Sequence, residues 1–421
     1  MVSNASWLIS EKVFTMFIGL FTTALIARYF GPEQFGLFNY ALAFVTLFTA
    51  ISSLGLETFV VKELVDKEYE EGTIVFSSFI LRLISGSILT ALTVGVINII
   101  EPNDRILHLI VLILSLSMVF KAFEVIKFWM HRYQLGKTLT IVRIIVYVFF
   151  SLLKVFVVLF DGDLFHYALL FLIDAVIFGI TLVIVYFNIR NSKSRLSFSF
   201  SFARNILSKS WYIILSGLMA TLYMRVDQVM LGSMIENTRE LGIYSAAVRV
   251  AEMWYFIPMA IITSFKPVIM EYKNLNNNKY HETLIKLYSV MLWVGIVVGV
   301  VIILFSKIII NILYGADFTK ASSILTISVW AGTFGMLGTA RSTWLISENL
   351  QKYNLAFMSV GMIINIILNL ILIPKIGGYG AAIATLIAQI YVALIGALFF
   401  KTTRIATKMM LKAINPKRML N

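Results

Sequence analysis

Runs of about 20 mostly apolar residues recur along this sequence, and each is long enough to cross the hydrocarbon core of a bilayer as a helix. Short polar turns separate the runs, and no series of alternating polar and apolar residues indicates a transmembrane barrel. The sequence therefore predicts an all-α polytopic membrane protein with about twelve transmembrane helices. We expect the spans at roughly 6–30, 36–60, 74–98, 106–129, 139–160, 164–187, 210–233, 241–264, 284–305, 322–345, 354–374 and 379–400.

The composition agrees with a chain embedded in lipid and restricts its chemistry. Only 14% of the residues are charged and the mean hydropathy is +0.89, whereas about 25% of a soluble chain is charged. The chain has no cysteine and only four scattered histidines, so we expect no metal site. No phosphate-binding loop with its lysine is present. We therefore predict that the chain holds no cofactor and does not hydrolyse ATP.

The basic residues predict the orientation of the chain. When the loops are assigned alternately to two sides, one side receives about nineteen lysines and arginines and the other only five. The positive-inside rule then places both termini and the middle loop in the cytoplasm. This distribution accounts for most of the formal net charge of +13, so we do not expect a nucleic-acid partner.

A weak internal repeat divides the chain into two halves. Ser6-Trp7 opens the first span and Ser210-Trp211 opens the seventh, and a second match joins residues 36–41 to residues 242–247 at nearly the same offset. A parallel repeat of this kind is typical of transporters whose ligand site lies between the halves. We predict a six-helix lobe at 1–190, a cytoplasmic linker at 191–208, a second six-helix lobe at 209–400 related by pseudo-two-fold symmetry around a central cavity, and a basic cytoplasmic tail at 401–421.

Two segments outside the spans allow two interpretations each. The alternating serines and phenylalanines of residues 197–202 fit a short strand or an amphipathic segment resting on the membrane. In the tail, Lys401, Arg404, Lys408 and Lys412 recur at helical spacing. They fit a basic helix on the anionic inner leaflet, or a positive-inside anchor alone.

Several bases lie deep inside the predicted spans. An ionisable side chain at the bilayer centre costs at least ~2.5–3.5 kcal/mol, so it usually faces a wet cavity or a partner. Arg225 and Arg249 lie at similar depth in adjacent spans, about 12 Å from the turn that joins them. Arg82 and Lys121 are comparably deep, whereas Arg143 and Arg341 lie close enough to a helix end to reach the headgroups. We expect Arg225, Arg249, Arg82 and Lys121 to form a cationic substrate-binding cavity, with structural ion pairs as the alternative.

The acids inside the spans are candidates for pairing or for ion coupling. Glu124 and Glu252 each follow a base by three residues, a spacing that allows pairing on one helix face. Asp174 has no basic partner nearby in the sequence, so we expect it to sense a coupling proton or sodium ion, or to be hydrogen-bonded and inert. Asp227 lies two residues after Arg225 and cannot face the same cavity, so we expect it to pair with a neighbouring helix, Arg249 being a candidate.

Several motifs resemble those of one transporter family. The N-terminal stretch LIARYFGPEQFGLFNYALAFVTLFTAISSLGLETFVVKEL resembles the start of the polysaccharide transporter family, the oligosaccharide flippases known as Wzx. In the second half, Asp227-x-x-x-Leu231-Gly232, then Gly242-x-Tyr244-x-Ala246-Ala247, and later Gly377-x-x-Gly380-Ala381-Ala382-x-Ala384-Thr385 match the family's pattern. The resemblance covers essentially the whole chain.

The resemblance implies a fold, a substrate and partners, and on the same ground we expect a transporter, not an enzyme. Its superfamily includes multidrug exporters and lipid II flippases, with two six-helix bundles around a V-shaped cavity. The family members move undecaprenyl-diphosphate-linked oligosaccharide repeat units to the outer leaflet for O-antigen and lipopolysaccharide, capsule or exopolysaccharide biosynthesis. By the same resemblance, a polysaccharide polymerase and a chain-length regulator are expected partners. The family has no short catalytic motif, so it assigns no role to a single residue.

Two alternatives remain at this stage. A cation-coupled multidrug exporter of the same superfamily would be expected to have an acidic cavity, and the spans hold more bases than acids. A membrane polymerase or ligase usually has a large outer loop, and the longest predicted here is only about 15 residues, around 307–321.

Overall fold

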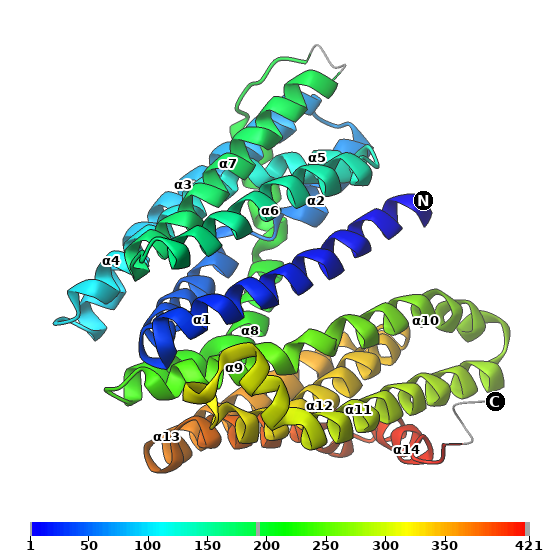
Figure 1. The fold of residues 1–421 in the computed structure, drawn as a ribbon. Coiled ribbons are helices and arrows are strands. Elements are labelled where there is room, and N and C mark those ends of the chain that lie inside the picture. Colours follow the sequence, from blue (N-terminus) through cyan, green and yellow to red (C-terminus); the bar gives the residue numbers. More distant parts are fainter. Residues whose placement is uncertain (1, 191–193, 417–421) are drawn as a thin grey trace. The chain divides into compact units, whose positions relative to one another are not determined.

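The computed structural model describes residues 2–190 and 194–416, and their regular secondary structure is helical (Figure 1). Ten helical stretches in this part of the chain are long and apolar enough to cross a membrane. The chain is thus an all-α polytopic membrane protein, as predicted. Its α-helices are α1 (Val2–Ser52), α2 (Leu56–Asp66), α3 (Glu71–Ile100), α4 (Arg105–Phe120), α5 (Val125–Arg132), α6 (Gly136–Leu159), α7 (Leu164–Ile189), α8 (Phe200–Met234), α9 (Arg239–Glu252), α10 (Phe256–Leu275), α11 (Asn277–Tyr314), α12 (Ala321–Ser347), α13 (Gln351–Ile390) and α14 (Arg404–Lys412).

The difference between ten stretches and twelve predicted spans arises at two bends. The stretches Ser10–Asp66 and Gln351–Leu398 each contain two of the predicted apolar runs. Gly31 has φ 70° and ψ 172°, and Gly377 has φ 55° and ψ −133°, so the helix direction changes without an intervening loop. Glycine adopts such angles at little cost. The backbone is therefore non-helical at both places where the sequence predicts a break between spans, and the break is a kink at a glycine instead of a polar turn.

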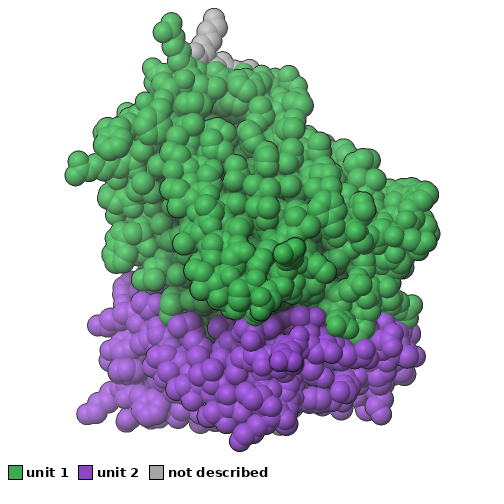
Figure 2. Space-filling model, turned by 90° about the vertical axis from the view of Figure 1, so that its left-hand side faces the viewer, with its two compact units in different colours: residues 1–225 green, residues 226–421 purple. Residues whose placement is uncertain are grey.

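The chain divides into two compact units, Met1–Arg225 and Val226–Asn421 (Figure 2). The core of the first unit joins α2, α3, α5, α6 and α7 around large buried side chains such as Trp129 and Phe150. The core of the second joins α10 to α14 around Tyr288, Met291 and Trp344. The division falls inside α8, and the second lobe that we predict to begin at residue 209 also begins within that helix; the lobe bounds stay a prediction.

Several helix ends are fixed by polar side chains. Asp104 accepts a hydrogen bond from the backbone N–H of Leu107 (2.9 Å), and Asp163 accepts one from the N–H of His166 (3.0 Å). Such caps satisfy N–H groups that have no partner within the helix.

The segment between the predicted lobes lies along α3. Residues 194–199 form no helix or strand, so the strand that the serine–phenylalanine alternation allowed is not formed there. The Ser194 hydroxyl accepts a hydrogen bond from the N–H of Gly72 (2.9 Å), and Ser197 shares one with Thr73 (2.8 Å). The serines therefore bind the segment to the first turns of α3. Residues 191–193 of the predicted linker and 417–421 of the predicted tail lie outside the described residues.

The C-terminal helix α14 packs on its own unit with one face. Ala406, Met409 and Met410 are buried in the second core, and the Thr407 hydroxyl donates to the carbonyl of Leu394 (3.1 Å). Of the four predicted bases of the tail, Arg404, Lys408 and Lys412 lie on this helix and Lys401 precedes it, and all four are exposed. The apolar face that a surface helix would dip into lipid is thus used for packing within the protein.

Two glycines of α3 allow a matched test of this packing. A Cβ at Gly86 would lie 2.6 Å from the carbonyl oxygen of Met118 in α4, whereas a Cβ at Gly95 would meet nothing within 4 Å. Replacing either glycine with alanine stabilises the helix by about 1 kcal/mol through helix propensity. At Gly86 the added methyl group also overpacks against the backbone of α4, which costs about 1–3 kcal/mol. We expect Gly86→Ala to lower the thermal unfolding midpoint in detergent and Gly95→Ala to maintain or raise it. Equal midpoints would show that α3 and α4 do not pack this closely.

Candidate functional site: a charged cluster in the first unit

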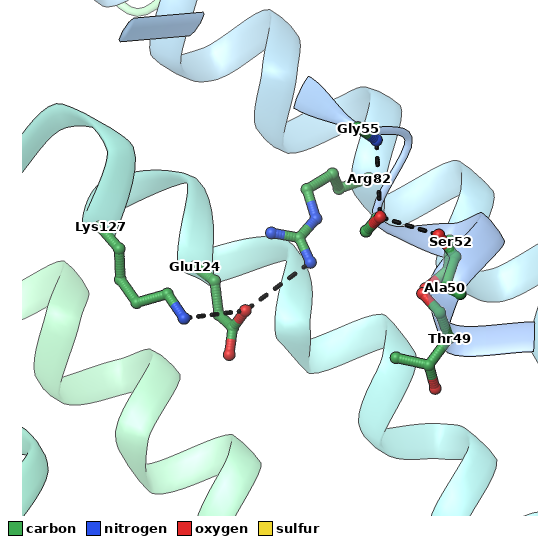
Figure 3. A network of polar contacts seen from close by, with 8 residues as sticks. Thr49, Ala50, Ser52, Gly55, Arg82, Glu124 and Lys127 are labelled. Atoms are coloured by element: carbon green, nitrogen blue, oxygen red, sulfur yellow. Dashed lines mark hydrogen bonds and ion pairs between the residues drawn. The ribbon is translucent and has the colours of Figure 1, made fainter. Parts of the chain in front are cut away.

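Three charged side chains from α3, the turn after α4, and α5 meet in the first unit (Figure 3). A carboxylate oxygen of Glu124 lies 3.2 Å from the Lys127 ammonium and 3.8 Å from the Arg82 guanidinium. Only 5% of the Arg82 side chain is exposed, against 25% for Glu124 and 28% for Lys127. The Glu124 carboxylate is thus shared by two bases at a half-buried position. This pairing lowers the free-energy cost of burying the charged side chains inside a membrane protein.

The local backbone explains why these groups converge. α4 ends at Phe120 and passes into a 3₁₀ turn, Lys121–Glu124, before α5 begins. Residues three apart eclipse one another in a 3₁₀ helix, so Lys121 and Glu124 project to the same side. Lys127 follows after another three residues. Lys121 interacts electrostatically with Glu124, Arg82, Lys127 and Arg143, so it belongs to the same cluster.

A second ion pair joins α6 to α7. The Arg143 guanidinium lies 3.5 Å from an oxygen of Asp174, and its centre lies 4.7 Å from the centre of the Phe178 ring. The Lys127 ammonium lies 6.0 Å from the same ring. Asp174 therefore has an ion-pair partner on another helix, while its role in ion coupling stays a prediction. The 31-residue separation of Arg143 and Asp174 hides the pair from the sequence, and a partly buried arginine is stabilised by a carboxylate and an aromatic face.

Two further residues extend the cluster toward α2. His131 contacts Glu57 at 3.3 Å, and Glu57 interacts electrostatically with Lys127 and Arg82. The cluster therefore contains four fixed bases and three carboxylates, with an excess of one positive charge while His131 is neutral. Its bases are Arg82, Lys121, Lys127 and Arg143, and its acids are Glu57, Glu124 and Asp174.

Sequence reasoning found part of this cluster and missed the rest. Arg82, Lys121, Glu124 and Asp174 were all candidates, and the structure brings them together. Lys127 was missed because it lies near the end of a predicted span, although the spacing Lys121-x-x-Glu124-x-x-Lys127 is a usable signal in a 3₁₀ turn.

The second unit contains a network of buried polar side chains. The Tyr244 hydroxyl of α9 donates to the carboxylate of Asp227 in α8, and the Thr385 hydroxyl of α13 donates to the same oxygen at 3.4 Å. Asn365 donates to Thr385 at 3.1 Å, and Asn369 donates to Asn365 at 3.0 Å. Asp227 is 6% exposed. It faces neighbouring helices, as expected, and these hydrogen bonds are made with neutral groups.

The remaining predicted residues are divided between the two units. Arg225 is the last residue of the first unit, while Arg249 and Glu252 lie in the last turn of α9 in the second. All three are half-buried. Arg249 interacts electrostatically with Tyr314 of α11. The pairing of the two arginines in one cavity stays a prediction.

Arg341 differs from its expected position. The side chain is 0% exposed, and its guanidinium donates to the carbonyl oxygens of Val392 and Ala393 and stacks 4.6 Å from the Phe357 ring. The expectation that it reaches the headgroups is wrong. The two carbonyls belong to the π-helical turn Tyr391–Ile395, whose wider hydrogen-bond spacing makes them available to the guanidinium.

Family models match most of the chain. Residues 1–273 match the model described as "Polysaccharide biosynthesis protein", and residues 213–371 match "MatE". A capsular polysaccharide biosynthesis protein, CapF of Staphylococcus aureus, is 20% identical over 403 residues, which span 95% of this chain and 99% of CapF. The probable low-salt glycan biosynthesis flippase Agl15 of Haloferax volcanii is 25% identical over 382 residues, 88% of this chain and 76% of Agl15.

Solved structures show the same fold. The lipid II flippase MurJ in an inward closed conformation matches with a TM-score of 0.74 at 20% identity, covering 97% of this chain and 90% of MurJ. An inward-facing multidrug resistance transporter of the MATE family matches with a TM-score of 0.76 at 15% identity, covering 94% and 96% of the two chains. The chain therefore has the fold shared by MurJ and the MATE transporters.

Two buried tyrosines of the second unit test the hydrogen bond to Asp227. The Tyr244 hydroxyl donates to that carboxylate, whereas the hydroxyl of Tyr288, which is 0% exposed, has no hydrogen-bond partner in the described part of the chain. Loss of a donor to a buried carboxylate costs about 1–3 kcal/mol. Tyr244→Phe should therefore lower the unfolding midpoint in detergent, while Tyr288→Phe should leave it unchanged or raise it. The reverse order of the two midpoints would contradict the described network.

Proposed function

Because this chain belongs to the polysaccharide biosynthesis protein family, within the superfamily of multidrug, oligosaccharidyl-lipid and polysaccharide exporters, we propose that it is a flippase for a lipid-linked glycan. The family comprises transporters, not enzymes. CapF is named for capsule biosynthesis and Agl15 is named as a flippase, and both names support a role in polysaccharide or glycan assembly. The shared fold with MurJ supports lipid-linked cargo.

The observation that carries the proposal is the charged cluster of the first unit. A lipid-linked oligosaccharide has a phosphate or diphosphate headgroup, many hydroxyls and a long apolar tail. Moving such a lipid across the membrane requires half-buried cations that bind its headgroup. Arg82, Lys121 and Lys127, which surround the Glu124 carboxylate, supply these cations. Arginine is suited to this task because its planar fork donates to two phosphate oxygens at once.

More specifically, we propose that the substrate is an undecaprenyl-diphosphate-linked oligosaccharide, which the chain moves from the cytoplasmic to the outer leaflet of a bacterial inner membrane. Its product serves capsule, O-antigen or exopolysaccharide synthesis, together with a polymerase and a chain-length regulator. Transport proceeds by alternating access of two six-helix lobes, with twelve spans and both termini in the cytoplasm. The internal repeat, the two bends and the charge distribution between loops support this arrangement. The exposed bases of α14 face the anionic leaflet.

Individual residues receive roles in this account. Arg82, Lys121, Arg225 and Arg249 bind the headgroup, and Lys127 joins them on structural grounds. Asp174, Glu124 and Glu252 are the acids available for pairing or ion coupling. Asp227 has a structural role in packing α8 against α9 and α13.

A cation-coupled multidrug exporter is the second candidate, and the MatE match to residues 213–371 favours it. Cationic drugs require an acidic site, since like charges repel. The cluster of the first unit has more bases than acids, which favours an anionic cargo.

The proposal is tested by surface polysaccharide in a bacterial strain whose own flippase is deleted and replaced by this chain. Arg82→Gln and Lys127→Gln should each lower surface polysaccharide at least about tenfold at equal protein level, because a hydrogen bond to a charged group is worth ~1.5–3 kcal/mol. Lys307→Gln, an exposed position at the outer end of α11, is the control and should retain full activity. Arg225→Ala and Arg249→Ala test the other proposed pair in the same strain.

Full polysaccharide in the Arg82→Gln/Lys127→Gln double variant would contradict the assignment of the cluster to substrate. Drug resistance conferred by the wild-type chain, without polysaccharide, would favour the exporter.

A further inference from the structure

We propose that Glu124 is an exchangeable counter-ion, which neutralises Arg82 and Lys127 in the empty carrier and is displaced by the anionic headgroup of the substrate. This inference rests on the proposed function and assigns a specific role to one carboxylate of the same site.

The geometry shows a carboxylate that is shared and loosely held. Glu124 lies 3.2 Å from Lys127 and 3.8 Å from Arg82, and the second distance is too long for the forked pair that arginine makes with a firmly bound carboxylate. The Arg82 guanidinium also lies 5.8 Å from the centre of the Phe128 ring, an aromatic face that holds it in place when the carboxylate leaves. Arg82 thus stays oriented in both states.

The position of Glu124 in the backbone also favours exchange. It is the last residue of the 3₁₀ turn between α4 and α5, and such turns inside long helices often mark a functional hinge. A quarter of its side chain is exposed, so the carboxylate remains in contact with water when it moves. Lys121 lies on the same side of the turn and supplies a third cationic neighbour, beside Arg82 and Lys127. The Asp227 carboxylate, by contrast, is buried and accepts hydrogen bonds from two hydroxyl groups.

Exchange of Glu124 for the substrate headgroup keeps the binding bases paired throughout the transport cycle. A carrier that releases an anion leaves its binding cations unpaired, and an unpaired buried charge costs several kcal/mol. If Glu124 returns to Arg82 and Lys127 after release, those two bases have a counter-ion in both states. A diphosphate headgroup brings more oxygens and more charge than one carboxylate, so it displaces Glu124 from both bases.

The test measures binding of inorganic pyrophosphate to the full chain in detergent by calorimetry, at low ionic strength so that screening does not mask the effect. Removal of a competing counter-ion should tighten binding, so Glu124→Gln should lower the Kd about tenfold. Glu240→Gln is the matched control, since Glu240 pairs with Lys320 at 3.4 Å in the second unit and is 27% exposed. Its Kd should equal that of the wild type.

A double-mutant cycle keeps the test decisive if Glu124→Gln alone folds poorly. Lys127→Gln should weaken pyrophosphate binding, and Glu124→Gln added to it should restore the affinity while leaving the net charge of the wild type. No tightening in the single variant, or no restoration in the double variant, overturns the role of Glu124. If Arg82→Gln also leaves pyrophosphate binding unchanged, the proposed headgroup site is refuted together with the role of Glu124.

Discussion

Each charge that this chain carries into the membrane has to be neutralised, hydrogen-bonded or hydrated, and this requirement organises both compact units. Uncompensated, a buried ion costs more than a transport protein of marginal stability can tolerate. In the first unit the solution is mutual neutralisation, since Arg82 and Lys127 share Glu124, and Arg143 pairs with Asp174. These ion pairs link α3, α5, α6 and α7 at the site that we propose binds the charged headgroup of the substrate.

Two buried charges of the second unit are hydrogen-bonded to neutral groups. Asp227 accepts from the hydroxyls of Tyr244 and Thr385, and Arg341 donates to backbone carbonyls at a π-helical turn. Hydrogen bonds to neutral partners fix a side chain without leaving a mobile counter-ion. The second unit also has ion pairs, such as that of Lys320 with Glu240, so hydrogen bonding to neutral groups is a feature of Asp227 and Arg341 in particular.

The sequence predicted the helical membrane fold because apolar length and polar turns are local properties. It also identified most of the charged residues that matter, since an ionisable group inside an apolar run is visible without a structure. It did not predict which charges meet. Arg82 reaches Glu124 across 42 residues and Arg143 reaches Asp174 across 31, and only helix packing sets these distances. The sequence also predicts breaks between spans near Gly31 and Gly377, but not that each break is a kink centred on a glycine with positive φ.

The most direct test of a glycan flippase is transbilayer movement by the purified chain. Vesicles would be reconstituted with the protein and a short-chain lipid-diphosphate oligosaccharide, and the fraction of glycan accessible to an external lectin or glycosidase would be followed over time. The account predicts that the protein exposes glycan initially confined to the inner leaflet, at a rate proportional to protein content, and that external pyrophosphate slows it. Glycan that stays inaccessible at the rate of protein-free vesicles, with the chain folded and correctly inserted, would contradict it.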